Sequence, residues 1–460
     1  MKKFIGREKE ISLIGEILKK SSASVLIYGK RKVGKTTLIM QALKSSADST
    51  VYYECLKASK KDNVDNFVNE LVKLGVIPVF LSFTSFVDVF AYLHTLGRTL
   101  NIVIDEYPYL KHNEKPEIID SEFQKIIDNY IGNIRLFISG SHIGIMKDML
   151  AESNALYGRF SLIIRLKELN YLEASEFYPE KSVYEKIAFY SVFGGSPYIN
   201  GFIDSDKSLK QNVVDTILNQ NCPVFNYAEH LLVLDFFGSA NAENIMSIIA
   251  NGKKKYGEIE ASLYMKNNGL LSKQLTALLN LEIVKKSYPI NKVNDKKKHY
   301  YELCDNLLRF YYSFVYKNKS SLLMLGPEVF YDEYIEKSVV TFISHRFEEM
   351  CRDYFSLCVK SGHLRGITDI GSYYYDDSAT HSNGEFDVVL EKHGIYDVYE
   401  VKYYSAPLGT GEMLSEAKKI DSIKGLNVGN TGFISACGFE NYIPDYDLIS
   451  GDMLYEFNKN

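Results

Sequence analysis

The sequence has 460 residues, 46% of them hydrophobic, and a net charge of −5. At ~100–200 residues per domain this length predicts about three domains, and the small net charge points to no strongly acidic or basic partner. No apolar run approaches the ~20 residues of a membrane span, and the charged residues at positions 7–10 leave no apolar core for a signal peptide. Six scattered cysteines without a C-x-x-C pair indicate neither a zinc site nor a disulfide framework. We therefore expect a cytoplasmic protein with reduced thiols and no membrane partner.

A glycine-rich loop follows an early apolar strand at residues 25–28. The loop is Gly29-Lys30-Arg31-Lys32-Val33-Gly34-Lys35-Thr36-Thr37, and an apolar helix start follows it. Strand, glycine loop and helix in this order predict a Walker A phosphate site, because the glycines let backbone N–H groups point at an anion. Lys35 would reach the β- and γ-phosphates, and the Thr36 hydroxyl would bind Mg²⁺. The alternative is a glycine-rich turn that matches by chance.

A second buried strand ends in two carboxylates. Residues 101–104 are followed directly by Asp105 and Glu106. In the P-loop template Asp105 orders the Mg²⁺ shell, while Glu106 polarises the attacking water. A strand with solvated acids at its end would look the same in isolation, so the Walker B interpretation depends on the loop upstream.

A third strand, residues 135–138, leads to Ser139 and Ser141. These hydroxyls could sense the γ-phosphate or the water; the alternative is a strand-to-helix turn in which Ser141 caps a helix at residues 143–150. Arg159 follows, and a guanidinium suits phosphoryl charge. It could be an arginine finger across a subunit interface, an in-cis γ-phosphate sensor or an ordinary surface arginine.

Together these motifs resemble the archaeal-type ATPase family, in the STAND branch of AAA+-related P-loop NTPases. The resemblance covers roughly the first half of the chain and also includes Phe-Ile-Gly-Arg-Glu-Lys-Glu at 4–10 and Gly-Gly-Ser-Pro at 194–197. It implies ATP rather than GTP, and no Asn-Lys-x-Asp guanine motif is present. It also implies that Phe4 and Arg7 lie near the adenine and that Pro197 belongs to a helical lid that senses the nucleotide.

Three helical segments and two strands follow the lid. The expected helices are 243–250, 258–266 and 272–281, with strands at 282–286 and 299–303, which is the order of a winged helix. Residues 252–300 carry eleven lysines and four acids, so duplex DNA is the expected partner. The candidates for base contacts on the third helix are Gln274, Thr276 and Asn280. Solubilising lysines or a protein-docking winged helix are the alternatives.

The last part of the chain has its own charged pattern. Asp387 lies in one expected strand, and Glu400 and Lys402 share one face of the next. This D…E-x-K arrangement resembles the PD-(D/E)XK nucleases, which implies that Asp387 and Glu400 bind Mg²⁺ or Mn²⁺ and that Lys402 acts on the water. Glu348, in a helix expected at 342–359, would be a further ligand, with Glu349 as its competitor. A hairpin with charges on its wet face is the alternative.

We therefore predict an α/β protein with a parallel-sheet P-loop ATPase core at 1–165, a helical lid at 166–225, a winged helix at 226–318 and an α/β restriction-endonuclease-like domain at 319–460. The predicted function is an ATP-binding and ATP-hydrolysing switch coupled to DNA binding and to a metal-dependent nuclease. The alternative is a nucleotide-gated DNA- or protein-binding regulator whose nuclease fold is inactive. A homo-oligomer stays open in either case.

Overall fold

The protein folds into two compact units in a computed structural model. The first unit comprises residues 1–169 with 196–198, and the second comprises 170–195 with 199–460. The residues that the structure describes are 4–112, 114–227, 240–252, 254–264, 269–377, 382–423 and 425–456. No helix within these ranges is long and apolar enough to cross a membrane.

The first unit is built on a five-stranded parallel sheet in the order β2-β3-β4-β1-β5. The strands are β1 (Ala23–Tyr28), β2 (Ser49–Glu54), β3 (Leu100–Asp105), β4 (Ile134–Gly140) and β5 (Leu162–Arg165). The helices are α1 (Glu8–Leu18), α2 (Lys35–Leu43), α3 (Lys60–Lys73), α4 (Phe86–Thr95), the 3₁₀ turn η1 (Tyr107–Lys111), α5 (Pro116–Asn129) and α6 (Ile143–Asp148). Because all strands are parallel, their carboxyl ends meet at one edge of the sheet, where ligands bind in open α/β folds.

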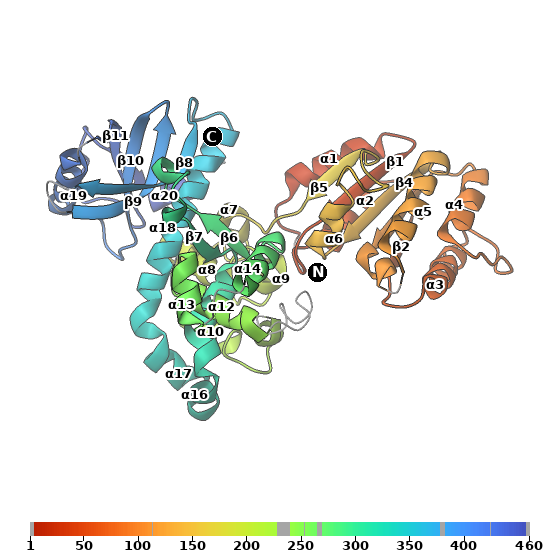
Figure 1. Ribbon diagram of the computed structural model, residues 1–460, viewed down its shortest axis with the longest axis horizontal. Helices are drawn as coiled ribbons and strands as arrows, with labels where there is room; N and C mark the ends of the chain where they lie inside the picture. The colour runs from red at the N-terminus through yellow and green to blue at the C-terminus, as the bar shows by residue number, and fades with distance from the viewer. Residues whose placement is uncertain are drawn as a thin grey trace. The chain divides into compact units, whose positions relative to one another are not determined.

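Both faces of this sheet are buried under helices (Figure 1). Side chains alternate along β1: Val25 and Ile27 pack with α1 and α2, whereas Leu26 and Tyr28 join the larger core formed with α3, α4 and α5. Burial on both faces explains why the strands are continuous apolar runs rather than alternating ones. The predicted α/β fold with a parallel sheet is confirmed.

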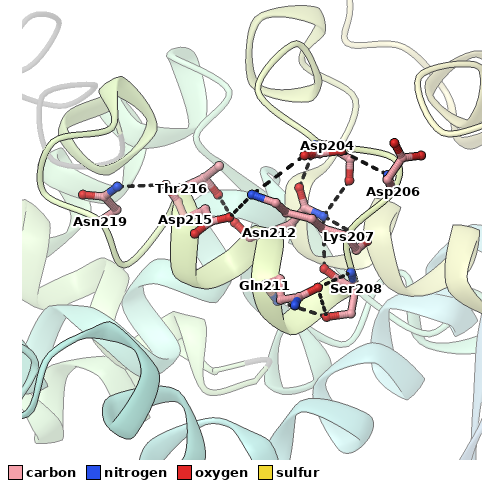
Figure 2. A network of polar contacts seen from close by, with 9 residues as sticks. All are labelled: Asp204, Asp206, Lys207, Ser208, Gln211, Asn212, Asp215, Thr216 and Asn219. Atoms are coloured by element: carbon pink, nitrogen blue, oxygen red, sulfur yellow. Dashed lines mark hydrogen bonds and ion pairs between the residues drawn. The ribbon is translucent and has the colours of Figure 1, made fainter.

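The second unit begins with helices. They are α7 (Tyr171–Ser175), α8 (Val183–Phe193), α9 (Pro197–Asn200, whose first two residues belong to the first unit), α10 (Leu209–Asp215), α12 (Ala240–Ala250), α13 (Tyr256–Ser262) and α14 (Leu270–Asn280). Figure 2 shows how local polar contacts fix the start of α10. Asn212 donates to the carbonyls of Asp204, Lys207 and Ser208, and its oxygen accepts from the Asp204 N–H. The turn before α10 is therefore held by one buried side chain.

A hairpin and a mixed sheet complete the second unit. The remaining elements are β6 (Val284–Ser287), η2 (Ile290–Lys292), η3 (Lys296–Lys298), β7 (Tyr300–Leu303), α15 (Asn306–Phe310), a π turn at Tyr311–Val315, η5 (Tyr316–Asn318), α16 (Lys319–Leu325), α17 (Pro327–Tyr334), α18 (Glu336–Lys360), β8 (Asp369–Asp377), β9 (Ser382–Lys392), β10 (Ile395–Lys402), α19 (Thr410–Ser422), β11 (Val428–Ser435), β12 (Asp447–Ser450) and α20 (Gly451–Glu456). The sheet order is β12-β11-β10-β9-β8, antiparallel from β8 to β10 and parallel from β10 to β12. His393 and Gly394 both have positive φ, as a two-residue hairpin turn between β9 and β10 requires.

The helices predicted as a lid pack within the second unit. Tyr184 of α8 stacks on Tyr403 at 4.3 Å between ring centroids and accepts a hydrogen bond from the Tyr403 hydroxyl through its carbonyl. The Tyr171 hydroxyl donates to the carbonyl of Leu454 at 2.8 Å. Helices α7 and α8 are therefore part of one body with the carboxy-terminal sheet. The division of the chain into four domains stays a prediction.

Candidate functional site

The glycine loop lies between β1 and α2 at the carboxyl edge of the sheet. A Cβ at Gly29 would meet the Leu166 carbonyl oxygen at 2.1 Å, so only glycine fits there. Gly34 has φ 92°, which also favours glycine. Lys35 is buried and donates to the carbonyls of Gly29 and Lys30, both at 3.0 Å. The loop thus curls around the ammonium group that was predicted to contact phosphates.

The Asp105 carboxylate, at the end of β3, joins several elements of the site. Its Oδ2 accepts from Thr36 Oγ1 at 2.5 Å and from the Tyr52 hydroxyl at 3.0 Å. Its Oδ1 accepts from Ser139 Oγ at 2.5 Å and from the Glu106 N–H at 2.9 Å. Hydroxyl and carboxylate oxygens are the ligands that Mg²⁺ prefers, so this donor set fits the ion that the motif implies.

Glu106 is held in a left-handed conformation, with φ 49° and ψ 42°. Its Oε2 accepts from the Ser141 hydroxyl at 2.8 Å and from the Ser141 N–H at 3.2 Å. The cap of α6 is instead His142, whose ring accepts from the Ile145 N–H. Ser141 is therefore not the helix cap; it orients the predicted catalytic carboxylate.

Arg7 and Phe4 lie at the same loop. The buried Arg7 guanidinium donates to the carbonyls of Val33 at 3.3 Å and Lys167 at 2.6 Å, and so fastens the P-loop to the segment after β5. Phe4 packs on the core beneath α1 and α2. Thr37 is exposed on the first turn of α2. Contact of these three residues with a nucleotide stays a prediction.

Residues 196–198 contact the P-loop within the first unit. Ser196 Oγ donates to the Lys32 carbonyl at 3.3 Å, and the Lys32 ammonium lies 4.4 Å from the centroid of the Tyr198 ring. A Cβ at Gly34 would be 3.8 Å from Pro197 Cγ. This segment lies between α8 and the rest of α9. A change in the conformation of the P-loop would therefore alter its contacts with residues 196–198.

Arg159 lies at the opposite edge of the sheet. Ser24, at the amino end of β1, donates to the Arg159 carbonyl at 2.5 Å, and the guanidinium donates to both Asp128 carboxylate oxygens at 2.9 and 3.1 Å. The P-loop begins beyond the other end of β1, about 13 Å away at ~3.3 Å per residue. An in-cis contact with the γ-phosphate is therefore wrong. An arginine finger across a subunit interface stays a prediction.

The three helices and the hairpin predicted after the lid are present as α12, α13, α14, β6 and β7, and Lys254 pairs with Tyr301 beside them. Gln274 is buried and so is not available for base contacts, whereas Thr276 and Asn280 are exposed. Lys253 and the predicted helix end at Lys266 lie outside the described residues. The winged-helix assignment stays a prediction.

The tip of the hairpin docks on β8, the edge strand of the carboxy-terminal sheet. Ile290 is buried in the core of that sheet, and a Cβ at Gly371 would meet its Cγ2 at 2.7 Å. The Asn291 side chain donates to the Tyr374 carbonyl at 2.7 Å and accepts from the Tyr374 N–H at 3.1 Å. The Lys298 ammonium lies 3.4 Å from the centroid of the Tyr374 ring. The tip of the hairpin, part of the lysine-rich segment expected to bind DNA, is thus engaged in contacts within the second unit.

Glu400 and Lys402 face α19 in the carboxy-terminal sheet. Lys402 Nζ donates to Glu400 Oε1 at 3.0 Å and lies 3.6 Å from Glu412 and 3.9 Å from Glu416, both on α19. Burial lowers the pKa of Lys402, but Glu400 and Glu416 outweigh it and raise the pKa above its ordinary value. The ammonium thus lies among three glutamates and donates its hydrogen bond to Glu400. Asp387 accepts from Arg352 through its carbonyl at 2.6 Å, and its role as a ligand stays a prediction.

Helix α18, which carries Glu348, packs on the other face of β10. Tyr399 and Tyr403 contact Phe355 and Phe347 of α18, at centroid distances of 4.7 and 6.0 Å. Side chains alternate along a strand, so Glu400 and Lys402 point away from α18. The prediction that Glu348 completes a site with Glu400 is therefore wrong; Glu348 instead lies 3.2 Å from His345. Across the described part of the chain, no group of three or more His, Cys, Asp or Glu side chains is arranged to hold a metal ion.

Glu349, the neighbour of Glu348, is the centre of an ion-pair cluster. It pairs with Lys285 of β6, and lies 3.5 Å from both Arg309 of α15 and Arg346 of its own helix. Burial raises the pKa of Glu349, but Lys285 and Arg309 outweigh it and lower the pKa to about 2. The cluster fastens the hairpin to α18.

Comparison with known proteins agrees with the geometry at the P-loop. Residues 4–199 match the model of a family described as an ATPase domain predominantly from Archaea. This match confirms that residues 4–199 resemble the archaeal ATPase family. Residues 311–420 match a second family, described as archaeal and bacterial proteins of unknown function, and this description names no nuclease.

Two archaeal proteins are similar to this chain. An uncharacterized protein of Methanocaldococcus jannaschii, MJECL04, is 26% identical over 356 residues, which are 76% of this chain and 77% of that protein. The Walker-type ATPase PABY2304 of Pyrococcus abyssi is 18% identical, with a TM-score of 0.52 over 67% of this chain and 96% of its own. At this level of identity the likeness concerns the fold alone.

Proposed function

We propose that this protein is an ATP-driven switch that binds and hydrolyses MgATP at the P-loop. The observation that carries the proposal is the hydrogen-bonded pair of Thr36 and Asp105, at 2.5 Å, beside the buried Lys35. Each of these groups has the chemistry its role needs: an ammonium for phosphate charge and two kinds of oxygen for a hard cation. The match of residues 4–199 to the model of an ATPase family supports the same conclusion.

Each residue of the P-loop site has a separate role in binding and hydrolysing ATP. Lys35 would exchange its loop carbonyls for phosphate oxygens, and Thr36 and Asp105 would hold Mg²⁺, which would neutralise phosphate charge. Ser141 binds Glu106 Oε2 and so fixes the carboxylate. Oε1 of Glu106 then accepts a proton from the attacking water.

A conformational change of the P-loop on ATP binding or hydrolysis would be transmitted to the second unit through residues 196–198. These residues touch Lys32 and Gly34 of the loop but are continuous in the chain with α8 and with the end of α9. Because α8 packs with the carboxy-terminal sheet, the second unit would respond as one body. This differs from a lid that moves two further domains relative to each other.

The test of the proposed activity is ATP hydrolysis by the full-length chain, measured as phosphate release with Mg²⁺, with EDTA and with GTP in place of ATP. We expect hydrolysis that requires Mg²⁺ and prefers ATP. Failure to bind ATP at millimolar concentration in Mg²⁺ would overturn the proposal.

We also propose that the second unit binds duplex DNA through lysines outside the docked hairpin tip. Lys273 of α14 and Lys286 of β6 are exposed. Replacing either lysine by Glu should weaken binding to duplexes of any DNA sequence. It should also reduce the slope of the logarithm of the binding constant against the logarithm of the salt concentration by ~0.9 for each lost phosphate contact. The matched control is Lys418→Glu on the exposed face of α19, and fluorescence anisotropy of a labelled duplex at several salt concentrations is the measurement. No affinity at low salt would favour a protein-docking module.

A regulator with an inactive nuclease fold is the second candidate, and the surroundings of Lys402 favour it over a nuclease. Lys402 Nζ lies within 4 Å of three glutamates and donates to Glu400 Oε1, so the predicted metal ligand Glu400 is already paired with the ammonium. We expect no plasmid cleavage by the full chain with ATP and Mn²⁺. Cleavage that requires Mn²⁺ and is lost in both Asp387→Ala and Lys402→Ala would restore the nuclease assignment.

A further inference from the structure

The carboxylate of Asp105 accepts four hydrogen bonds, two at each oxygen. An ionised carboxylate offers about four lone-pair positions, and Asp105 accepts from Thr36, Tyr52, Ser139 and the Glu106 N–H. Thr36, Ser139 and Glu106 belong to recognisable motifs. Tyr52 belongs to none, yet it shares Oδ2 with Thr36, the residue expected to hold Mg²⁺.

Tyr52 contacts Asp105 from the neighbouring strand. It lies on β2, where it pairs with Val103 of β3, and its ring packs on the core beneath α1 and α2. Tyr53, the next residue, points to the other face, where its hydroxyl donates to Asn63 at 2.7 Å. The Tyr52 hydroxyl therefore donates to Asp105 from the face of the sheet opposite to that of its neighbour Tyr53.

We propose that Tyr52 is a positioning residue for the magnesium ion, acting through Asp105. The inference rests on the proposed MgATP site. Mg²⁺ requires near-ideal octahedral geometry. An aspartate whose carboxylate can rotate should therefore bind Mg²⁺ more weakly than one whose carboxylate is fixed by hydrogen bonds. Partners that orient a metal ligand typically contribute ~10–100-fold to metal affinity or activity. Tyr52 and Ser139 clamp the two carboxylate oxygens from opposite neighbours of β3, namely β2 and β4.

The test compares Tyr52→Phe with Tyr53→Phe in the full-length chain. Both changes remove one buried hydroxyl from adjacent positions and keep the ring. The readout is equilibrium binding of a fluorescent, non-hydrolysable ATP analogue, titrated with Mg²⁺ and repeated in EDTA. For Tyr52→Phe we expect the Mg²⁺ concentration at half-saturation to rise ~10-fold, with unchanged affinity in EDTA. Tyr53→Phe should match the wild type in both conditions.

A double substitution separates positioning from packing. If Tyr52 acts through Asp105, its effect on Mg²⁺ dependence should disappear in an Asp105→Asn background, because both changes then alter the same contact. Wild-type Mg²⁺ dependence in Tyr52→Phe would overturn the inference and leave the proposed ATPase intact. So would an equal loss of affinity with and without Mg²⁺, which would indicate packing alone. Absence of nucleotide binding by the wild type would instead refute the proposed function.

Discussion

Glu106→Gln should bind ATP with near wild-type affinity and hydrolyse it ~10²–10⁴-fold more slowly. The amide keeps the shape of the side chain and can still contact Ser141, but it cannot take a proton from water. Phosphate release and nucleotide binding, measured separately, check this expectation. The matched control is Glu54→Gln, an exposed acid at the end of the neighbouring strand β2, which should hydrolyse ATP at close to the wild-type rate. Equal hydrolysis by Glu106→Gln and wild type would remove Glu106 from the role of base.

Lys35→Ala should lose nucleotide binding rather than turnover alone. Lys35 is the cation enclosed by the loop, within 3.0 Å of two of its carbonyls, and alanine offers no charge to the phosphates. Lys44→Ala, at the other end of α2 and exposed, is the control for a lysine-to-alanine change on the same helix. Retained affinity in Lys35→Ala would contradict the assigned phosphate contact.

Glu349→Ala should destabilise the second unit by about 3–5 kcal/mol, the typical cost of removing one partner of a buried ion pair. It would leave Lys285 and Arg309 facing each other without the carboxylate that lies between them. Glu348→Ala changes the adjacent residue, which pairs with the exposed His345 at 3.2 Å, and should cost less than ~1 kcal/mol. Urea titration measures both; similar midpoints for the two variants would show that the cluster contributes little.

The same cluster predicts a dependence of stability on pH. The folded-state pKa of Glu349 is about 2, below its ordinary value of 4.5, so its contribution of about 3 kcal/mol is present above pH 4.5 and is lost as the pH falls toward 2. Burial and the charge of Glu349 raise the pKa of Asp353 from 3.8 to about 6. Asp353 therefore adds stability as the pH falls through 6. Glu349→Gln should abolish the acidic loss, and Asp353→Asn should flatten the change near pH 6.

The P-loop site was largely predictable from the sequence because its signals are local. Gly29 to Thr37 are contiguous, and Asp105 and Glu106 directly follow an apolar run. Because the strands are parallel, both motifs lie at the same edge of the sheet although β4 separates β1 from β3. Tyr52 was not predictable, since it reaches Asp105 from another strand and belongs to no spacing pattern. The predicted in-cis contact of Arg159 with the γ-phosphate was wrong for a related reason. A local motif does not reveal at which edge of the sheet a loop lies.

In the carboxy-terminal sheet, the sequence pattern predicted which residues share a strand face but not which helix covers that face. Alternation correctly placed Glu400 and Lys402 on one face of a strand, but the sequence does not say which helix covers that face. Glu348 was therefore assigned to the wrong side. Gln274 likewise fits an exposed helix position by type, yet it is buried.

The hairpin on β8 makes the predicted boundary near residue 318 a poor place to divide the chain. Removing everything before it would take away Ile290, whose side chain fills the space above Gly371, and would unpair the backbone of Tyr374 at the rim of the sheet. An uncovered edge strand is a template for pairing with other chains. The edge of the carboxy-terminal sheet is thus covered by a segment that lies 83 residues earlier in the chain, so a fragment that begins at residue 319 would present this edge to other chains.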